Sequence, residues 1–291
     1  MALFRRTRDH RQQLDELERL VAREFEAQGI PGEIVRDPDD PTNSHYVTGS
    51  QGWFGLRNIV LWCLKAPEKQ WRRMIREHIT ALTSADDAPT VDLDDEHARA
   101  ALRARLFPEQ LVEVDGMEYV RPFAPGLVEA LCLDLPSTVQ TLKREQLAGV
   151  DLDAAFDLGR RNLAQEEPED VGMAGTDLRF AGGSSLFIAS RVLDHAFVAR
   201  HIRPAERGYV FGVPDRHLVF WHVVTGPESV TAVNSLVELM RQLPAEERPG
   251  GLLSREVYFA RAGEVQRITE GTVDGGVAVR AEGAFLEALQ D

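Results

Sequence analysis

The spacing of apolar residues changes several times along the first 84 residues. Leu14, Leu17, Val21 and Phe25 recur at intervals of three and four, which predicts an amphipathic helix over about 8–28. Three short strand-like segments and two further helices follow, so an N-terminal α-β-β-β-α-α module over 1–84 is expected. The strands are expected at 32–36, 44–49 and 51–56, and the helices from Leu56 and from Pro67.

The next segment, 85–98, is rich in aspartate and poor in large apolar residues. Acidic stretches of this kind are typical of solvated connections between domains. The pattern therefore predicts an acidic linker at 85–98 between the first module and a C-terminal module over 99–291.

The C-terminal module begins with strand-like segments. The apolar run 127–135 carries large side chains on both faces, which is typical of a central strand. A hairpin is expected over 109–123 with Asp115-Gly116 at its turn. A helix is expected over 151–164, with Asp151 as its N-cap.

The remaining pattern is strand, helix, two strands, helix and a final hairpin. A long helix is expected after Gly183, with Ala189, Val192, Leu193, Ala196 and Phe197 on its inward face. The order β-α-β-β-α-β is that of a ferredoxin-like split βαβ unit. The expected fold class is α+β, with mixed or antiparallel sheets and helices on one face. The strands are expected at 177–181, 208–213, 217–224, 255–260 and 264–269, and the second helix at 228–243.

Composition and charge limit the partners. The chain has 291 residues, of which 43% are hydrophobic and 27% charged, so it can bury a sizeable core. The formal net charge of −14 disfavours binding to nucleic acid and to anionic membranes. It favours a protein partner with a basic or apolar face.

Cysteine and hydropathy patterns point to a reducing compartment. Cys63 and Cys132 each lie in an apolar run, without a CxxC or Cys/His cluster, so two buried thiols are expected and a zinc site is not. The N-terminus carries charge but no apolar segment behind it, and no apolar run approaches the roughly 20 residues of a membrane span. We expect a cytoplasmic protein.

The stretch AGGSS, 181–185, raises the question of a phosphate-binding loop. It has neither the spacing and lysine of a P-loop nor the GxGxxG of a dinucleotide-binding turn. A glycine turn with Ser184 or Ser185 capping a helix is therefore favoured over a phosphate site. No cofactor is expected.

Candidate catalytic groups are few. Arg191, Asp194 and His195 would share one helix face, either as a surface ion pair, which we favour, or as a general base with its orienting carboxylate. GxSxG is absent, so no nucleophile is tied to them. His217 and His222 are five apart in one strand and point to opposite faces, so no metal site is expected.

Five pieces of the second half occur in a characteristic order: RLFP (105–108), EALCLDLP (129–136), RRNL (160–163), ASRVL (189–193) and GVPDRHLVF (212–220). In these pieces and their order the chain resembles the YtpQ-like bacterial proteins, a family of unestablished function. The resemblance covers roughly residues 100–225 and implies a cytoplasmic α/β-type protein without supplying catalytic residues. The family tends to have Asp and Gly shortly before the ASR triplet, where this chain has 185–188, SLFI.

Two functions from different classes remain open. The first is a non-catalytic binding protein, an adaptor, chaperone or immunity-like factor; the N-terminal element order also resembles the secretion-chaperone fold, whose members are small acidic binders of other proteins. The alternative is a hydrolase or transferase with a site assembled from scattered polar residues. A pocket that gathers three of these residues favours the enzyme, and a broad face without such a pocket favours the binder. The candidate residues are Arg105, Asn162, Arg191, Asp194 and Asp215.

Overall fold

The computed structural model divides the chain into two compact units, the first reaching Ala88 and the second containing most of the chain from Pro89 onward. Each unit is described by itself. The structure describes residues 10–36, 44–48, 52–84, 91–114, 117–135, 138–202, 205–243, 251–272 and 276–290.

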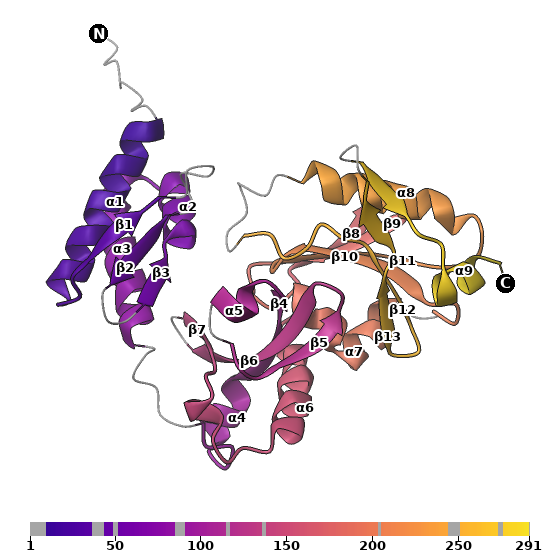
Figure 1. Ribbon diagram of the computed structural model, residues 1–291, viewed down its shortest axis with the longest axis horizontal. Helices are drawn as coiled ribbons and strands as arrows, with labels where there is room; N and C mark the ends of the chain where they lie inside the picture. Colours follow the sequence, from indigo (N-terminus) through magenta and orange to yellow (C-terminus); the bar gives the residue numbers. More distant parts are fainter. Residues whose placement is uncertain are drawn as a thin grey trace, which may run out of the picture. The chain divides into compact units, whose positions relative to one another are not determined.

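The first unit has the predicted α-β-β-β-α-α order (Figure 1). Its strands form an antiparallel sheet in the order β1-β2-β3, and the three helices pack against it and one another. Gly29 ends the first helix with a positive φ of 79°, a conformation that glycine adopts without strain. The elements are α1 (His10–Ala27), β1 (Gly32–Val35), β2 (His45–Thr48), β3 (Gly52–Gly55), α2 (Arg57–Lys65) and α3 (Glu68–Ser84).

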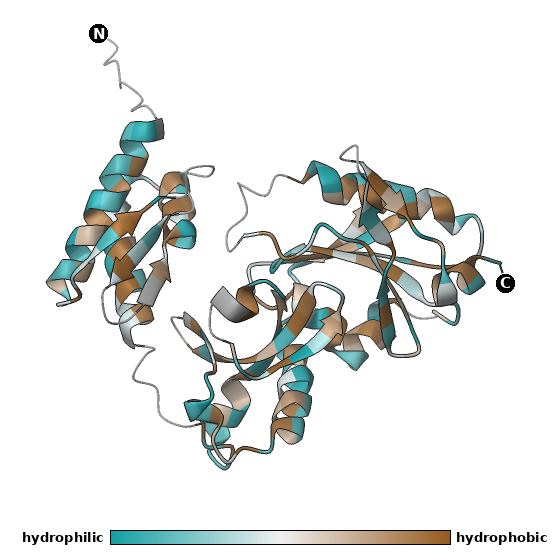
Figure 2. Ribbon diagram, viewed as in Figure 1, coloured by the Kyte–Doolittle hydropathy of each residue, from teal (hydrophilic) through white to brown (hydrophobic). Residues whose placement is uncertain are grey.

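The core of the first unit is built from the periodic apolar positions of α1 and α3. Leu14, Leu17, Val21 and Phe25 of α1 are all buried, as their spacing predicts. Figure 2 shows the outer side of α1 as largely hydrophilic. The ring of Phe25 stacks on a buried tyrosine of β2, with 4.1 Å between the ring centroids.

The second part of the predicted acidic linker belongs to the second unit. Residues 85–90 lie outside the described residues, but Val91 is buried in the core of the second unit. Asp95 then caps helix α4 (Glu96–Ala101), accepting hydrogen bonds from the amides of His97 and Ala98. The prediction of a linker up to residue 98 is wrong for its second half, because an aspartate in this pattern serves as an N-cap rather than as a solvated charge.

The second unit begins with a small antiparallel sheet centred on the long apolar strand. Strand β6 (Leu127–Leu135) pairs with three neighbours, which confirms its predicted central place. The neighbours are β4 (Leu102–Pro108), β5 (Val120–Ala124) and β7 (Thr138–Thr141).

The predicted hairpin over 109–123 is wrong. Residues Leu111–Val114 form a helical turn, α5, and Asp115-Gly116 lies outside the described residues. The hairpin joins β5 to β6 instead and turns at Pro125-Gly126, where Gly126 has a φ of 85°. Proline followed by glycine supplies the two backbone conformations that a tight turn needs.

Helix α6 (Leu152–Asn162) covers one face of this sheet. Asp151 caps it by accepting a hydrogen bond from the amide of Ala154, as predicted. Gly159 lets the helix approach β4 closely, since a Cβ atom at this position would lie 2.7 Å from the backbone nitrogen of Ala104. Short 3-10 turns lie on either side of α6, η1 (Glu145–Leu147) before it and η2 (Leu163–Gln165) after it.

The larger sheet of the second unit has six strands in the order β13-β12-β10-β11-β9-β8, and each described pair is antiparallel (Figure 1). The predicted strands at 177–181, 208–213, 217–224, 255–260 and 264–269 all belong to it. The first strand of the sheet was not predicted. The strands are β8 (Asp170–Ala174), β9 (Leu178–Gly182), β10 (Tyr209–Asp215), β11 (Leu218–Val223), β12 (Tyr258–Arg261) and β13 (Glu264–Arg267).

The connections within this sheet are split crossovers. β11 lies between β9 and β10, and β10 lies between β11 and β12, so each crossover skips one strand. The ferredoxin-like expectation is nevertheless wrong in its strand order. In a ferredoxin-like sheet the first strand lies beside the fourth, whereas here the second strand, β10, pairs with the fourth, β12.

Both faces of the larger sheet are covered. Helices α8 (Ser229–Gln242) and α9 (Gly283–Gln290) pack on one face, which agrees with the expectation of helices on one side. Within α8, Val233 and Met240 are buried and Val230 is exposed. A two-stranded ribbon, β14 (Thr269–Gly271) and β15 (Val277–Val279), lies between the sheet and α9 in sequence.

The other face carries three short turns where one long helix was predicted. The turns are the 3-10 turn η3 (Ala189–Leu193), the single α-helical turn α7 (His195–Phe197) and the π-helical turn η4 (Val198–Ile202). The helix is interrupted at Asp194, whose backbone is extended and whose carboxylate caps the next turn. Four of the five predicted inward residues are buried, and Ala196 is exposed.

None of the described helices is long and apolar enough to span a membrane.

Candidate functional site

Arg191 and Asp194 form an ion pair, with 3.4 Å between Nη2 and Oδ2. The side chains are only 2% and 6% exposed, so the prediction of a surface ion pair is wrong about its location. Nη1 of Arg191 donates to the carbonyl oxygen of Leu163, and the guanidinium lies 5.0 Å from the ring centroid of Phe197. Burial lowers the pKa of Arg191, while the carboxylate of Asp194 acts in the opposite direction.

The geometry makes this pair a structural clamp rather than a general base with its orienting group. Asp194 Oδ1 accepts the amide of Ala196 at 2.8 Å, so the carboxylate holds the start of α7. His195, the third member of the predicted constellation, is exposed. The pair joins η3 to the end of α6 and to α7. Replacing either residue alone would leave the other as a buried charge without its partner.

Asn162 also has a structural role. Its Nδ2 donates to the carbonyl oxygens of Arg99 and Leu102, at 2.7 and 2.9 Å. These two acceptors lie at the end of α4 and the start of β4. Asn162 therefore fastens the end of α6 to the preceding chain.

The last two candidates lie in the second unit on different elements. Arg105 projects from β4 over the ring of Phe107, with 4.8 Å between its Cζ atom and the ring centroid. Asp215 ends β10 and accepts the amide of His217 at 2.8 Å, which closes the turn to β11. Arg216, which follows Asp215, was not among the predicted residues.

Three surface depressions of about 360, 420 and 480 Å³ occur among the described residues. The third lies between α6 and α7, and of the five candidate residues it contains Asp194 alone. The first two contain none of the candidates. Five scattered candidates are therefore not gathered into any of these three depressions.

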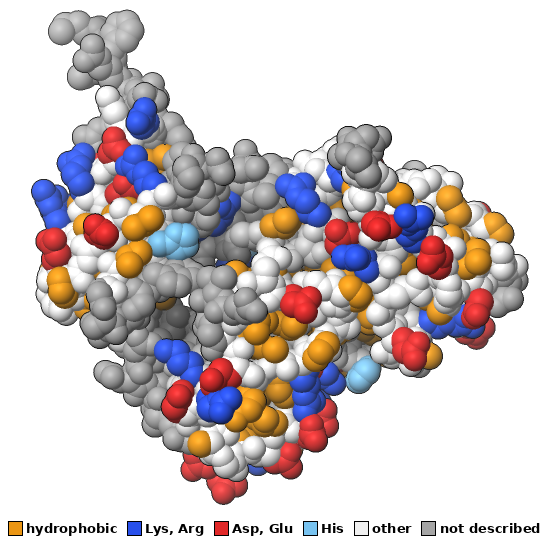
Figure 3. Space-filling model, viewed as in Figure 1, with side chains coloured by type: hydrophobic (Ala, Val, Ile, Leu, Met, Phe, Trp, Pro, Cys, Tyr) orange, Lys and Arg blue, Asp and Glu red, His pale blue; other side chains and the backbone are white. Residues whose placement is uncertain are grey.

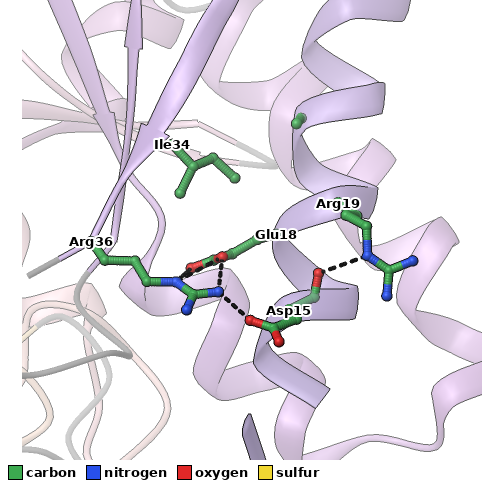
Figure 4. A pocket seen from close by; sticks show the side chains of 6 residues that line it. Asp15, Glu18, Arg19, Ile34 and Arg36 are labelled. Atoms are coloured by element: carbon green, nitrogen blue, oxygen red, sulfur yellow. Dashed lines mark hydrogen bonds and ion pairs between the residues drawn. The ribbon is translucent and has the colours of Figure 1, made fainter. Parts of the chain in front are cut away.

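The first depression lies in the first unit and is organised around Arg36 (Figure 4). The guanidinium reaches from the end of β1 to α1, where Nε donates to both carboxylate oxygens of Glu18 at 2.8 and 2.9 Å. Nη2 also donates to Asp15, which lowers the pKa of that carboxyl group. Because these carboxylates occupy the guanidinium, the arrangement joins β1 to α1 and leaves little charge for a ligand.

The other two depressions also contain or adjoin paired arginines. Arg121 at the second lies over the ring of Phe156 and pairs with Asp153. Arg160 at the third pairs with the buried carboxylate of Glu129 on β6. Both pairs join α6 to the sheet. Removing Arg160 would leave the buried carboxylate of Glu129 without its partner, whereas the carboxylate of Asp153 is exposed to solvent.

The AGGSS stretch forms neither a phosphate loop nor the predicted helix cap. Ser184 Oγ donates to Glu169, and Ser185 Oγ donates to Glu166 at 2.6 Å. Ser185 Oγ accepts the amide of Phe187 across a local turn, but a regular α-helix does not start there. Glu166 and Glu169 accept the hydrogen bonds of these two serine hydroxyl groups, and their negative charge disfavours a phosphate at this loop.

The cysteines and histidines offer no reactive cluster among the described residues. Cys63 and Cys132 are free and buried, as predicted, and burial raises the pKa of both thiols, that of Cys63 to about 12. Among the residues with described positions, groups of three His, Cys, Asp or Glu side chains that could hold a metal ion do not occur.

The most accessible apolar feature of the second unit is strand β8 at the end of its sheet. Val171 and Met173 are 43% and 50% exposed and share one face of the strand, two residues apart. Only β9 pairs with β8 among the described strands, so alternate backbone N–H and C=O groups of β8 point away from the sheet. The sequence signal for this strand was the alternation Val-Gly-Met before the Gly175-Thr176 turn.

Acidic residues flank this edge. Glu169 and Asp170 stand at its beginning, and Asp177 follows the turn at its end. At the opposite edge of the sheet, β13 carries the exposed charged residues Glu264 and Arg267, which disfavour pairing with a further strand. On the face drawn in Figure 3, acidic and basic side chains of the described residues are interspersed without a continuous basic area.

No family model, no curated protein and no solved structure matches this chain.

Proposed function

We propose that the protein is a non-catalytic binding protein, an adaptor, chaperone or immunity-like factor, that takes an extended segment of a partner protein along the edge of β8. The observation that carries the proposal is the unpaired edge with Val171 and Met173 exposed on one face. An extended segment can add to such an edge through backbone hydrogen bonds, while alternate side chains give specificity.

Charge indicates the chemistry of the partner segment. Glu169, Asp170 and Asp177 place negative charge at both ends of the strand, within a chain of net charge −14. A segment with apolar side chains opposite Val171 and Met173 and with lysine or arginine at its ends would complement this edge. None of the three depressions found among the described residues gathers three of the five candidate residues, which supports a binder over a hydrolase or transferase.

The resemblance to the YtpQ-like proteins and the cytoplasmic location belong to the same proposal. Both are compatible with buried free thiols and with described helices too short or too polar to span a membrane. The resemblance contributes no residue to the proposed edge, which stands on the exposure and pairing of β8 alone.

The test compares partners captured from lysate of the source cell by the wild-type chain, by Met173→Asp and by Val230→Asp. Met173→Asp places a charge on the β8 face, whereas Val230, 44% exposed on α8, provides a matched apolar-to-acidic control away from the edge. We expect one protein to be retained by the wild type and by Val230→Asp and lost with Met173→Asp. Its binding should weaken between low and moderate salt, because screening shortens to about 8 Å at physiological ionic strength.

The outcome that contradicts the proposal is a set of captured proteins unchanged by Met173→Asp. A second variant, Arg179→Gln, tests the charge argument. Arg179 pairs with Met173 in the sheet and is the basic residue directly beside the exposed face. Its removal makes the edge more acidic, so a basic segment should bind at least as well as it does to the wild type.

A further inference from the structure

Two arginines of the second unit, Arg105 and Arg216, lie on segments that both adjoin the turn η3. The amide of Leu106, next to Arg105, donates to Ser190 Oγ at 3.0 Å, and the amide of Ala189 donates to the carbonyl oxygen of Arg216 at 3.1 Å. Arg105 projects from β4, and Arg216 lies in the turn between β10 and β11. The guanidinium groups form no hydrogen bond or ion pair with a described residue, and Nε of Arg105 is buried. By contrast, Arg36, Arg103 and Arg160 are each bonded to a carboxylate.

The surroundings leave a net positive charge. Among the described residues, the carboxylate whose charge acts on Arg216 is that of Asp215, which also accepts the amide of His217. Burial, followed by the charge of Arg105, lowers the pKa of Arg216 to about 9, and burial, followed by the charge of Arg216, lowers the pKa of His217. His217 is therefore neutral at pH 7.5, and two cations face one anion.

Cys132 does not supply the missing negative charge. It lies on β6, on the same face of the sheet as Arg105, and burial raises the pKa of its thiol. The uncharged thiol lies 3.8 Å from Thr141 Oγ1. The apolar wall on the other side is the ring of Phe107, which holds the guanidinium of Arg105 at 4.8 Å and leaves its donors free.

We propose that Arg105 and Arg216 together bind a small oxyanion from solution, a phosphate or a carboxylate group. Both side chains remain partly accessible, so an anion can reach them. A guanidinium presents planar paired N–H donors that match the oxygens of phosphate and carboxylate groups. A bound oxyanion balances the excess charge and satisfies donors that are costly to bury unpaired. This site is independent of the β8 edge.

The experiment titrates the full chain with sodium phosphate and with sodium acetate by isothermal calorimetry at pH 7.5, with sodium chloride holding the ionic strength constant. We expect one equivalent of at least one oxyanion to bind. Arg105→Gln and Arg216→Gln should each weaken binding by about tenfold to a hundredfold, as the loss of a charged hydrogen-bonding partner does. Comparison of the two titrations tells phosphate from carboxylate. The control is Arg267→Gln, an exposed arginine of β13 in the same unit, which should bind as the wild type does.

Folding of the variants is checked by melting temperature in chloride alone. A variant that keeps a cooperative melting transition is folded, so loss of oxyanion binding in that variant is assigned to the missing guanidinium group. Arg105→Lys, which keeps the charge without the paired donors, should bind more weakly than the wild type and more tightly than Arg105→Gln. The proposal is overturned if neither oxyanion binds better than chloride, or if both glutamine variants bind as the wild type does.

Discussion

The imidazole of His78 is largely buried on a helix whose other polar side chains are mostly exposed. It lies on α3 with its ring 5.6 Å from that of Trp62, edge to face, and its Nε2 atom is buried without a hydrogen-bonding partner. Burial lowers the pKa of His78 to about 4 from an ordinary value of 6.5. The folded protein therefore holds this imidazole neutral over a range in which the unfolded chain protonates it.

The consequence is a loss of stability on acidification. The stabilising contribution is complete above pH 6.5 and declines as the pH falls toward 4, because the unfolded chain binds the proton first. We expect His78→Leu to gain about 2 kcal/mol relative to the wild type between pH 7 and pH 5, measured by urea unfolding at both values. His97→Gln, a substitution at a fully accessible histidine, is the control and should keep the wild-type pH dependence. Equal pH dependence in wild type and His78→Leu would refute the assignment.

The structural roles of some single residues follow from the sequence, and those of others depend on tertiary contacts. The spacing of Leu14, Leu17, Val21 and Phe25 was enough to predict α1 and its buried face. Gly159 could not be interpreted in the same way, because its role depends on the backbone of β4, some 55 residues earlier in the chain. The buried location of Arg191 and Asp194 was likewise hidden, since i,i+3 spacing on its own is more typical of a surface pair.

At the scale of elements, the β12–β13 hairpin carries local strain at its turn. Ala262 has a φ of 52° and Gly263 a φ of 89°, so both turn residues are left-handed, as in a type I′ turn. For alanine this conformation costs roughly 1 kcal/mol, whereas glycine adopts it freely.

We therefore expect Ala262→Gly to raise the free energy of unfolding by about 1 kcal/mol, measured by urea titration. The opposite exchange, Gly263→Ala, should lower it by a similar amount or more. A lower stability for Ala262→Gly would mean that the alanine methyl group contributes contacts that outweigh the strain.

Elements with a clear period were predictable, and those defined by a local interruption were not. Helix α8 and the β10–β11 hairpin follow directly from apolar periodicity. The helix predicted after Gly183 has the apolar spacing of a helix, yet Asp194 prefers to cap a new turn, and the chain breaks into η3, α7 and η4. Strand β8 was missed because Gly172 and its acidic start weaken the strand pattern. The β8 edge and the pair of Arg105 and Arg216 could not be predicted from the sequence, because strand pairing and the approach of distant segments are tertiary properties.

At the scale of the whole molecule, the hydrophobic cores of the two units share no residue. The core of the first unit is drawn from residues 14–79, and the three clusters of the second from residues 91–289. A substitution in one core should therefore act on the stability of that unit alone.

Hydrogen exchange measured by mass spectrometry checks this expectation. Ile79→Ala should reduce amide protection in α1 and α3 by the equivalent of about 2–5 kcal/mol, as buried truncations do. Protection in β10 and β11 should stay within about 0.5 kcal/mol of the wild type. Val233→Ala on α8 supplies the reverse comparison. A parallel fall in both units after either substitution would show one cooperative structure.

The interleaved order of the larger sheet bears on how it is assembled during synthesis. β10 is synthesised before β11, but β11 is the strand that pairs with β9. β9 and β10 therefore lie about 10 Å apart in the folded sheet, with β11 between them. β10 gains its correct neighbour only when the chain turns at Arg216 and β11 emerges. The two strands can then pair as a local hairpin and dock on β9 together. Formation of the β10–β11 turn is therefore expected to precede the pairing of these strands with β9.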